Sequence, residues 1–267
     1  MLRVNHLSGF GRIVPAVGGS YDTDAQAFFT ATGISDTTIK DAVDALVISL
    51  KADGIWANCI AIYPFVGGTA DTHKYNLKDP QDTDAAFRVV WSGITHNANG
   101  ITGGSGQGDT KIVPATHMTL NDTHVSIYSR TDTDSGTDIG VISGSDRISL
   151  RVRTSGGCAL EMYTSGGTGA FFTANGDGKG FYVGTRRSSS DMESYKNGVS
   201  IDTQTGAHSG ALPTTNSLYL CNLNGFADAS GKNIAFASVG AGLTDTEVAD
   251  FTTAVETFQD ALSRGVV

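Results

Sequence analysis

About ten short apolar runs, separated by glycine-rich turns, occupy the chain from residue 59 to residue 239. In the run 147–153 (RISLRVR), apolar residues alternate with polar ones, and the run 124–130 shows the same period. A period of two is typical of antiparallel strands that place one face on a core. The composition agrees, because 34 glycines against only 5 prolines favour many tight turns. Together these features predict a β-sandwich or barrel.

One pair of predicted strands is joined by Asn197 and Gly198, in the stretch ESYKNGVSI. Both residues tolerate positive φ, so the pair predicts a two-residue type I′ turn and an antiparallel hairpin. The predicted strands are 59–65, 86–91, 124–130, 147–153, 159–163, 180–185, 193–196, 199–203, 217–223 and 233–239.

Before Gly54 the period is helical instead. A first helix is expected to begin at Asp24 and to end at Gly33, and a second to open at Ser35 or Asp36. The second helix carries one apolar stripe, and Gly54 suits the position after its last turn. A stripe of this kind must pack on another element, and the β region that follows is the candidate.

The chain closes with a further amphipathic helix over 244–264, where Thr244 and Glu247 form a capping box and Gly265 ends the helix. The predicted organisation is an amino-terminal arm (1–22), a helical segment (23–54) and a sandwich with its carboxy-terminal helix (55–267). About thirty residues cannot bury a core alone, so the helical segment is expected to pack on the sandwich. The arm is expected to serve in docking.

The formal net charge of −9 and the pI of about 5.0 argue against binding to nucleic acid, which needs clustered cations. Arg147, Arg151 and Arg153 share one parity and are expected to lie on a solvated strand face. No stretch has the length of apolar sequence that a membrane span requires, so no membrane insertion is expected. The three cysteines form no paired motif and are expected to be free thiols, in a protein made in a reducing cytoplasm.

Three aspartates in RTDTDSGTDIG offer a candidate metal site. Asp132, Asp134 and Asp138 have the alternating spacing with which a calcium loop opens. The late bidentate glutamate of such a loop is absent, so a polar turn between strands is favoured over calcium. No histidine spacing typical of zinc occurs.

A carbohydrate site is the second candidate, because aromatic residues cluster in the first third of the chain. Most are expected in the core, and a minority could stack on sugar rings. Trp91, His96 and Asp132 are the candidate glycan-binding residues. Catalytic residues are not expected, because there is no strand with paired carboxylates, no nucleophile elbow and no phosphate-binding loop.

Two parts of the chain resemble known proteins. The stretches ESYKNGVSI, SLYLCNLN and NIAFASVGAGLTDTEVADF resemble the closing half of concanavalin A-like, laminin G-type jelly rolls. The stretch 31–103 resembles the head of a family of tailed-bacteriophage virion proteins, and the resemblance covers nearly the whole chain from about residue 20. Its most specific part is the segment from Gly54 to Asp84, with GIW, YPFVGG and HKYNLKDP. The implied fold is a mainly β, antiparallel concanavalin A-like jelly-roll sandwich with amino-terminal helices and a carboxy-terminal helix packed on it.

The resemblance implies a non-enzymatic structural protein of the virion, exposed on the tail tip or fibre and able to bind a host receptor. A capsid decoration protein, as head cement or spike, and a lectin-like carbohydrate-binding module are the alternatives. The expected partners are other virion proteins, further copies of the chain in a homo-oligomer, and host surface glycan. Polysaccharide degradation is the least favoured function.

Overall fold

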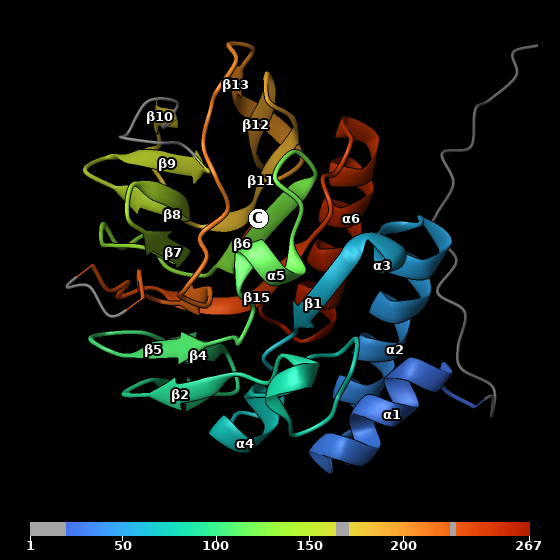
Figure 1. The fold of residues 1–267 in the computed structure, drawn as a ribbon. Helices are drawn as coiled ribbons and strands as arrows, with labels where there is room; N and C mark the ends of the chain where they lie inside the picture. Colours follow the sequence, from blue (N-terminus) through green and yellow to red (C-terminus); the bar gives the residue numbers. More distant parts are fainter. Residues whose placement is uncertain (1–19, 164–170, 225–227) are drawn as a thin grey trace, which may run out of the picture.

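The computed structural model describes residues 20–163, 171–224 and 228–267. They form two β-sheets packed face to face, with long helices on one side only (Figure 1). Every pair of neighbouring strands in the two sheets is antiparallel. The mainly β antiparallel sandwich with terminal helices is therefore confirmed. None of the described helices combines the length and apolar character needed to cross a bilayer.

The first sheet has eight strands in the order β13-β12-β11-β6-β15-β4-β3, and β1 pairs with the far end of β15. Its strands are β1 Cys59–Tyr63, β3 Thr95–Asn97, β4 Gly100–Thr102, β6 Thr123–Ser129, β11 Gly180–Ser188, β12 Asp191–Lys196, β13 Val199–Gln204 and β15 Asn233–Gly240.

The second sheet has seven strands in the order β10-β9-β8-β7-β14-β5-β2. Its strands are β2 Val90–Ser92, β5 Gln107–Asp109, β7 Ile139–Ser143, β8 Asp146–Thr154, β9 Gly157–Met162, β10 Phe171–Ala174 and β14 Tyr219–Leu220.

The alternation in the sequence places one face of each sheet in the core between them. Ile148, Leu150 and Val152 of β8 are buried there, as are Val125 and Ile127 of β6. Burying each such side chain contributes roughly 1.5–3 kcal/mol. The predicted one-sided pattern is therefore confirmed for 147–153, whereas in 124–130 the alternate positions His124, Ser126 and Tyr128 are buried as well.

Three longer helices cover the other face of the first sheet (Figure 1): α1 Thr23–Thr32, α2 Thr37–Ala52 and α6 Asp245–Ala261. Their apolar stripes form a second core against the sheet, in which Leu46 and Phe251 meet Phe181 and Phe236. The first sheet is thus covered on both faces, whereas none of these three helices lies on the second sheet.

The structure corrects some of the helix boundaries predicted from the sequence. The cap of α1 is Asp22 rather than Asp24, because the Asp22 carboxylate accepts from the Asp24 backbone N–H at 2.9 Å. Gly33 ends this helix with φ 67°, as predicted. Asp36 caps α2, and Gly54 follows its end with φ 75°.

At α6 the predicted capping box is present, with Thr244 and Glu247 each accepting from the other's backbone N–H. The helix ends at Ala261, so the predicted end at 264 is wrong. The cause is Arg264, whose buried guanidinium turns inward to the carbonyl oxygens of Phe65 and Pro64.

Two predicted strands are shorter than expected. In the run 86–91 the chain first makes a 3-10 turn, Asp84–Ala86, and pairing begins only at Val90. In the run 217–223 only Tyr219 and Leu220 pair, because Cys221 has a φ of 60° and leaves the strand. The short helices α3 Ile55–Asn58, α4 Ala70–His73 and α5 Pro114–His117 complete the described elements.

The Asn-Gly hairpin is confirmed between β12 and β13, with φ 51° at Asn197 and φ 75° at Gly198. All three cysteines are buried free thiols, and burial raises the pKa of Cys59 and of Cys158 to about 12. Of the predicted arm, residues 1–19 lie outside the described residues, and Asp22 belongs to the cap of α1.

Candidate functional site

The outward face of the second sheet lies away from the three long helices of the described chain. Figure 1 shows β7 to β10 on the side of the sandwich away from α1, α2 and α6. We define the outward face as the side chains that point away from the core on β8, β9 and β10. They are Arg147, Ser149, Arg151, Arg153, Ala159, Glu161 and Phe172.

An arginine–glutamate ladder crosses this face. The Glu161 carboxylate accepts from Arg147 Nη1 and from Ser149 Oγ, both at 2.8 Å, and Arg151 Nη1 lies 3.6 Å away. The β8 arginines share one face as predicted, but the face is not the solvated one expected, because each arginine is half-buried and paired with a carboxylate. Because each arginine keeps a carboxylate partner, the ladder holds donors and acceptors in fixed positions.

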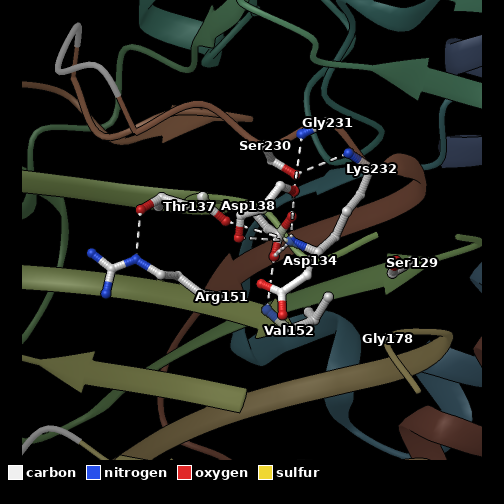
Figure 2. A network of polar contacts seen from close by, with 12 residues as sticks. Ser129, Asp134, Thr137, Asp138, Arg151, Val152, Gly178, Ser230, Gly231 and Lys232 are labelled. Atoms are coloured by element: carbon white, nitrogen blue, oxygen red, sulfur yellow. Dashed lines mark hydrogen bonds and ion pairs between the residues drawn. The ribbon is translucent and has the colours of Figure 1, made fainter. Parts of the chain in front are cut away.

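A second carboxylate extends the ladder to the side. Arg151 Nη2 donates to Asp228 at 3.1 Å, and Arg151 Nε donates to Thr137 Oγ1 at 3.1 Å (Figure 2). Arg153 pairs with Asp132 at the end of the same strand. Three arginines thus face three carboxylates, and the face carries almost no net charge.

Phe172 adds an aromatic group at the edge of the ladder. Its side chain is 57% exposed, whereas the adjacent Phe171 is buried in the core. The ring extends over Gly157, where an added Cβ would lie 2.6 Å from the ring. Phe172 pairs across the strands with Ala159, which pairs with Arg151. At about 5 Å per strand, the backbones of Phe172 and Arg151 lie roughly 10 Å apart, with the small side chain of Ala159 between them.

Trp91 and His96, two of the predicted glycan-binding residues, do come together. They lie on the edge strands β2 and β3, one in each sheet, with ring centroids 5.0 Å apart. Trp91 also packs on Gly108, where a Cβ would lie 2.3 Å from the indole ring. Its indole N–H is buried without a partner. Most of Trp91 therefore serves to close the core, which limits its use as a stacking platform.

His73, which the sequence analysis did not select as a site residue, is hydrogen-bonded to His96. Gly68 N–H donates to His73 Nε2 at 3.2 Å, so the proton of neutral His73 lies on Nδ1. His73 Nδ1 then donates to His96 Nδ1 at 3.0 Å. Burial lowers the pKa of His73 to about 3 and also lowers that of His96. Both rings are therefore neutral near pH 7.

Asp132 does not join the Trp91–His96 cluster. It pairs with Arg153 and accepts from the Gly178 backbone N–H at 2.7 Å, after the end of β6. These contacts lower the pKa of Asp132, with the Gly178 hydrogen bond as the largest favourable cause. Asp132 thus belongs to the end of the arginine ladder.

The three aspartates of the predicted calcium loop are also separated by their contacts. Asp134 accepts from the backbone N–H groups of Ser155 and Gly156 at 2.6 and 2.7 Å. Asp138 is fully buried beside Lys232, its carboxylate 3.3 Å from Nζ (Figure 2). Within the described residues, no three histidine, cysteine or acidic side chains are grouped to hold a metal.

No family model matches the chain, and no curated protein is significantly similar to it. Solved structures do share its fold. Domain 4 of an extracellular arabinanase from Geobacillus stearothermophilus, solved with arabinotriose, has 16% identity and a TM-score of 0.52. The match covers 73% of this chain and 98% of that domain.

Two larger proteins contain a similar domain. A sialidase from Trypanosoma rangeli has 11% identity and a TM-score of 0.55, over 85% of this chain and 40% of the sialidase. A structure of botulinum neurotoxin type C, described with two ganglioside molecules, has 10% identity and a TM-score of 0.53, over 76% of this chain and 52% of that one. The chain thus spans about half or less of these two proteins, and at such identity the likeness defines the fold alone.

Proposed function

We propose that the chain is a non-enzymatic, surface-exposed module of a tailed-phage virion that binds glycan on the host surface. The observation that carries the glycan part is the outward face of the second sheet. It carries an exposed phenyl ring two strands away from Arg151, whose guanidinium is fixed in a ladder of paired donors and acceptors.

The chemistry of this face fits a neutral sugar. A sugar ring offers one apolar face for stacking on Phe172 and hydroxyl groups that both donate and accept. Arg147 and Arg151, which are partly exposed, supply donors, whereas the buried Glu161 fixes their positions. The pairing leaves little net charge to attract an ion. The shared fold with a domain solved with arabinotriose supports the same class of ligand.

The virion part of the proposal rests on the resemblance of the segment from Gly54 to Asp84. In the structure this segment packs around Asn76, which is buried and bonded to the backbone of Ile60, Ile62 and Ala86. It contacts the edge strands β2 and β3 through the Phe65 ring, which packs against Trp91, and through His73, which is hydrogen-bonded to His96. Locating the chain in an imaged phage particle tests this assignment, and its absence from the particle would refute it.

A glycan array tests the ligand, run with and without calcium. Wild type is expected to bind neutral bacterial surface glycans in both conditions, and Phe172→Ala with Arg151→Ala is expected to lose at least tenfold in affinity. Ile48→Ala, at an exposed apolar position on α2, is the matched control and keeps binding. No hits would refute glycan binding, and loss in Trp91→Ala alone would move the site to the β2–β3 edge.

A further inference from the structure

A groove lies between α2 and α6 on the helical side of the molecule, opposite the outward face. Its volume is about 330 Å³. Leu46 and Phe258 form its floor, and the small side chains Ala45, Ala254 and Ala261 leave room along it. A second hollow of about 280 Å³ continues it, since Thr38 and Ala261 line both.

The lining specifies the chemistry of an occupant. The floor is apolar, and the groove proper contains no lysine or arginine but includes the exposed Asp41 at its rim. Asp36 lines the continuing hollow, as does Arg264, whose buried guanidinium is bonded to the backbone carbonyls of Phe65 and Pro64. Side chains as small as alanine allow a chain to approach the helices closely. The groove therefore fits an extended apolar segment that carries positive charge.

The first nineteen residues of this chain have that composition. They read MLRVNHLSGFGRIVPAVGG, with Arg3 and Arg12 but no acidic residue. The whole chain has 18 basic and 27 acidic residues. Without these two arginines the rest of the chain has 16 basic and 27 acidic residues, so its formal charge is −11. Leu7, Phe10 and Ile13 supply apolar groups for the floor. The charges of segment and groove are complementary.

The described chain also begins beside the groove. Tyr21 Oη donates at 3.1 Å to Asp41, which lines the groove. Fully extended, nineteen residues span roughly 60 Å, whereas α2 with 16 residues is about 24 Å long. The segment is therefore long enough to follow the groove from end to end.

We propose that the α2–α6 groove is the docking site for residues 1–19 of the same chain. Leu7, Phe10 and Ile13 would fill the apolar floor while an arginine faces Asp41. This inference does not depend on glycan binding. The groove lies between helices that pack on the first sheet, whereas the outward face belongs to the second sheet.

Limited trypsin digestion of the full chain, followed by intact mass, tests the docking. Arg12 is the reporter, since cleavage there removes residues 1–12. Docking predicts slow cleavage in wild type. Ala45→Phe fills the groove and is expected to raise the rate at least tenfold, whereas Ile48→Phe adds the same ring on an exposed part of α2 outside the groove and leaves it unchanged.

A second variant keeps the test valid if Ala45→Phe fails to fold. Asp41→Asn changes an exposed side chain, and is expected to raise cleavage about threefold with little change in Tm. Equal rates in all variants, or cleavage of wild type as fast as a free peptide, would overturn the proposal. Protection that appears only as the protein dimerises would also overturn it, because the segment of a second copy would then fill the groove.

Discussion

The carboxylate of Asp138 and the ammonium of Lys232 lie 3.3 Å apart, and neither side chain is exposed (Figure 2). Asp138 also accepts from Ser230 Oγ and from the Val152 backbone N–H, at 2.5 and 2.7 Å. Lys232 donates to Ser135 Oγ at 3.1 Å. The pair thus fastens the chain before β15 to the chain before β7, across the two sheets.

Breaking this pair is expected to be costly. Lys232→Met leaves a buried carboxylate unpaired, and such losses amount to about 3–5 kcal/mol. Burial already raises the pKa of Asp138, and the loss of Lys232 would raise it further. The free energy of unfolding, measured in urea, checks the prediction.

Asp71→Asn provides the matched comparison for that measurement. It breaks the ion pair of Asp71 with Lys74, in which Asp71 is 93% exposed. An exposed pair contributes little, so the expected change is below about 1 kcal/mol. A Lys232→Met effect no larger than that of Asp71→Asn would contradict a structural role for the buried pair.

Acid is expected to destabilise the fold through His124. Its ring is fully buried between the Ala241 carbonyl and Ser238 Oγ, and burial lowers its pKa to about 4 from about 6.5. The unfolded chain binds the proton more tightly, so stability is complete above pH 6.5 and is lost as the pH falls toward 4. The loss between pH 7 and pH 5 is about 2 kcal/mol for this group.

Urea unfolding at pH 7 and pH 5 isolates that contribution. His124→Gln removes the titrating ring, so the variant should lose about 2 kcal/mol less than wild type over this interval. His117→Gln retains His124 and should show the full loss. A His124→Gln variant whose loss equals that of wild type would show that other groups dominate the acid response.

Much of the fold could be predicted because its signals are local. The alternation in 147–153, the stripe on α2 and the turn at Asn197 each depend on neighbours within about ten residues. Boundaries were less predictable where a distant contact decides them. The inward turn of Arg264 onto Phe65 and Pro64, which shortens α6, involves residues far away in the sequence.

The candidate site shows the same limit. Phe171 and Phe172 are adjacent residues of the same type, so the sequence does not show which one is exposed. The pairing of Phe172 with Ala159 places it on the outward face. Asp138 follows two polar aspartates and was predicted in a polar turn, because nothing near it indicates the distant Lys232. Likewise, no spacing links His73 to His96, which meet only because β3 is brought back beside α4.

The packing of Trp91 on Gly108, at the edge of the sandwich, can be tested by substitution. At Gly108 an added Cβ would lie 2.3 Å from the indole, so Gly108→Ala must displace the ring. The expected cost is about 1–3 kcal/mol. In a Trp56→Phe background Trp91 is the sole tryptophan, and its emission should shift to longer wavelength. Gly176→Ala, where an added Cβ meets open space and the backbone φ is not in the left-handed region, tests for a general effect of alanine. An unshifted emission in Gly108→Ala would contradict the packing.

The turn between β12 and β13 gives the last prediction, which separates folding from binding. Gly198 has a φ of 75°, and an added Cβ there would meet α6 only at 3.4 Å, so backbone conformation rather than space is the constraint. A β-branched side chain is strained at this φ, and Gly198→Val should lower the free energy of unfolding by roughly 1–3 kcal/mol. Gly198→Asn is the matched variant and should lose less stability, because asparagine adopts this conformation more readily.

Urea unfolding ranks the stabilities of wild type and the two variants, and a glycan array on folded protein should give the same hits for all three. A folded Gly198→Val protein that loses those hits would instead place the hairpin in the binding site.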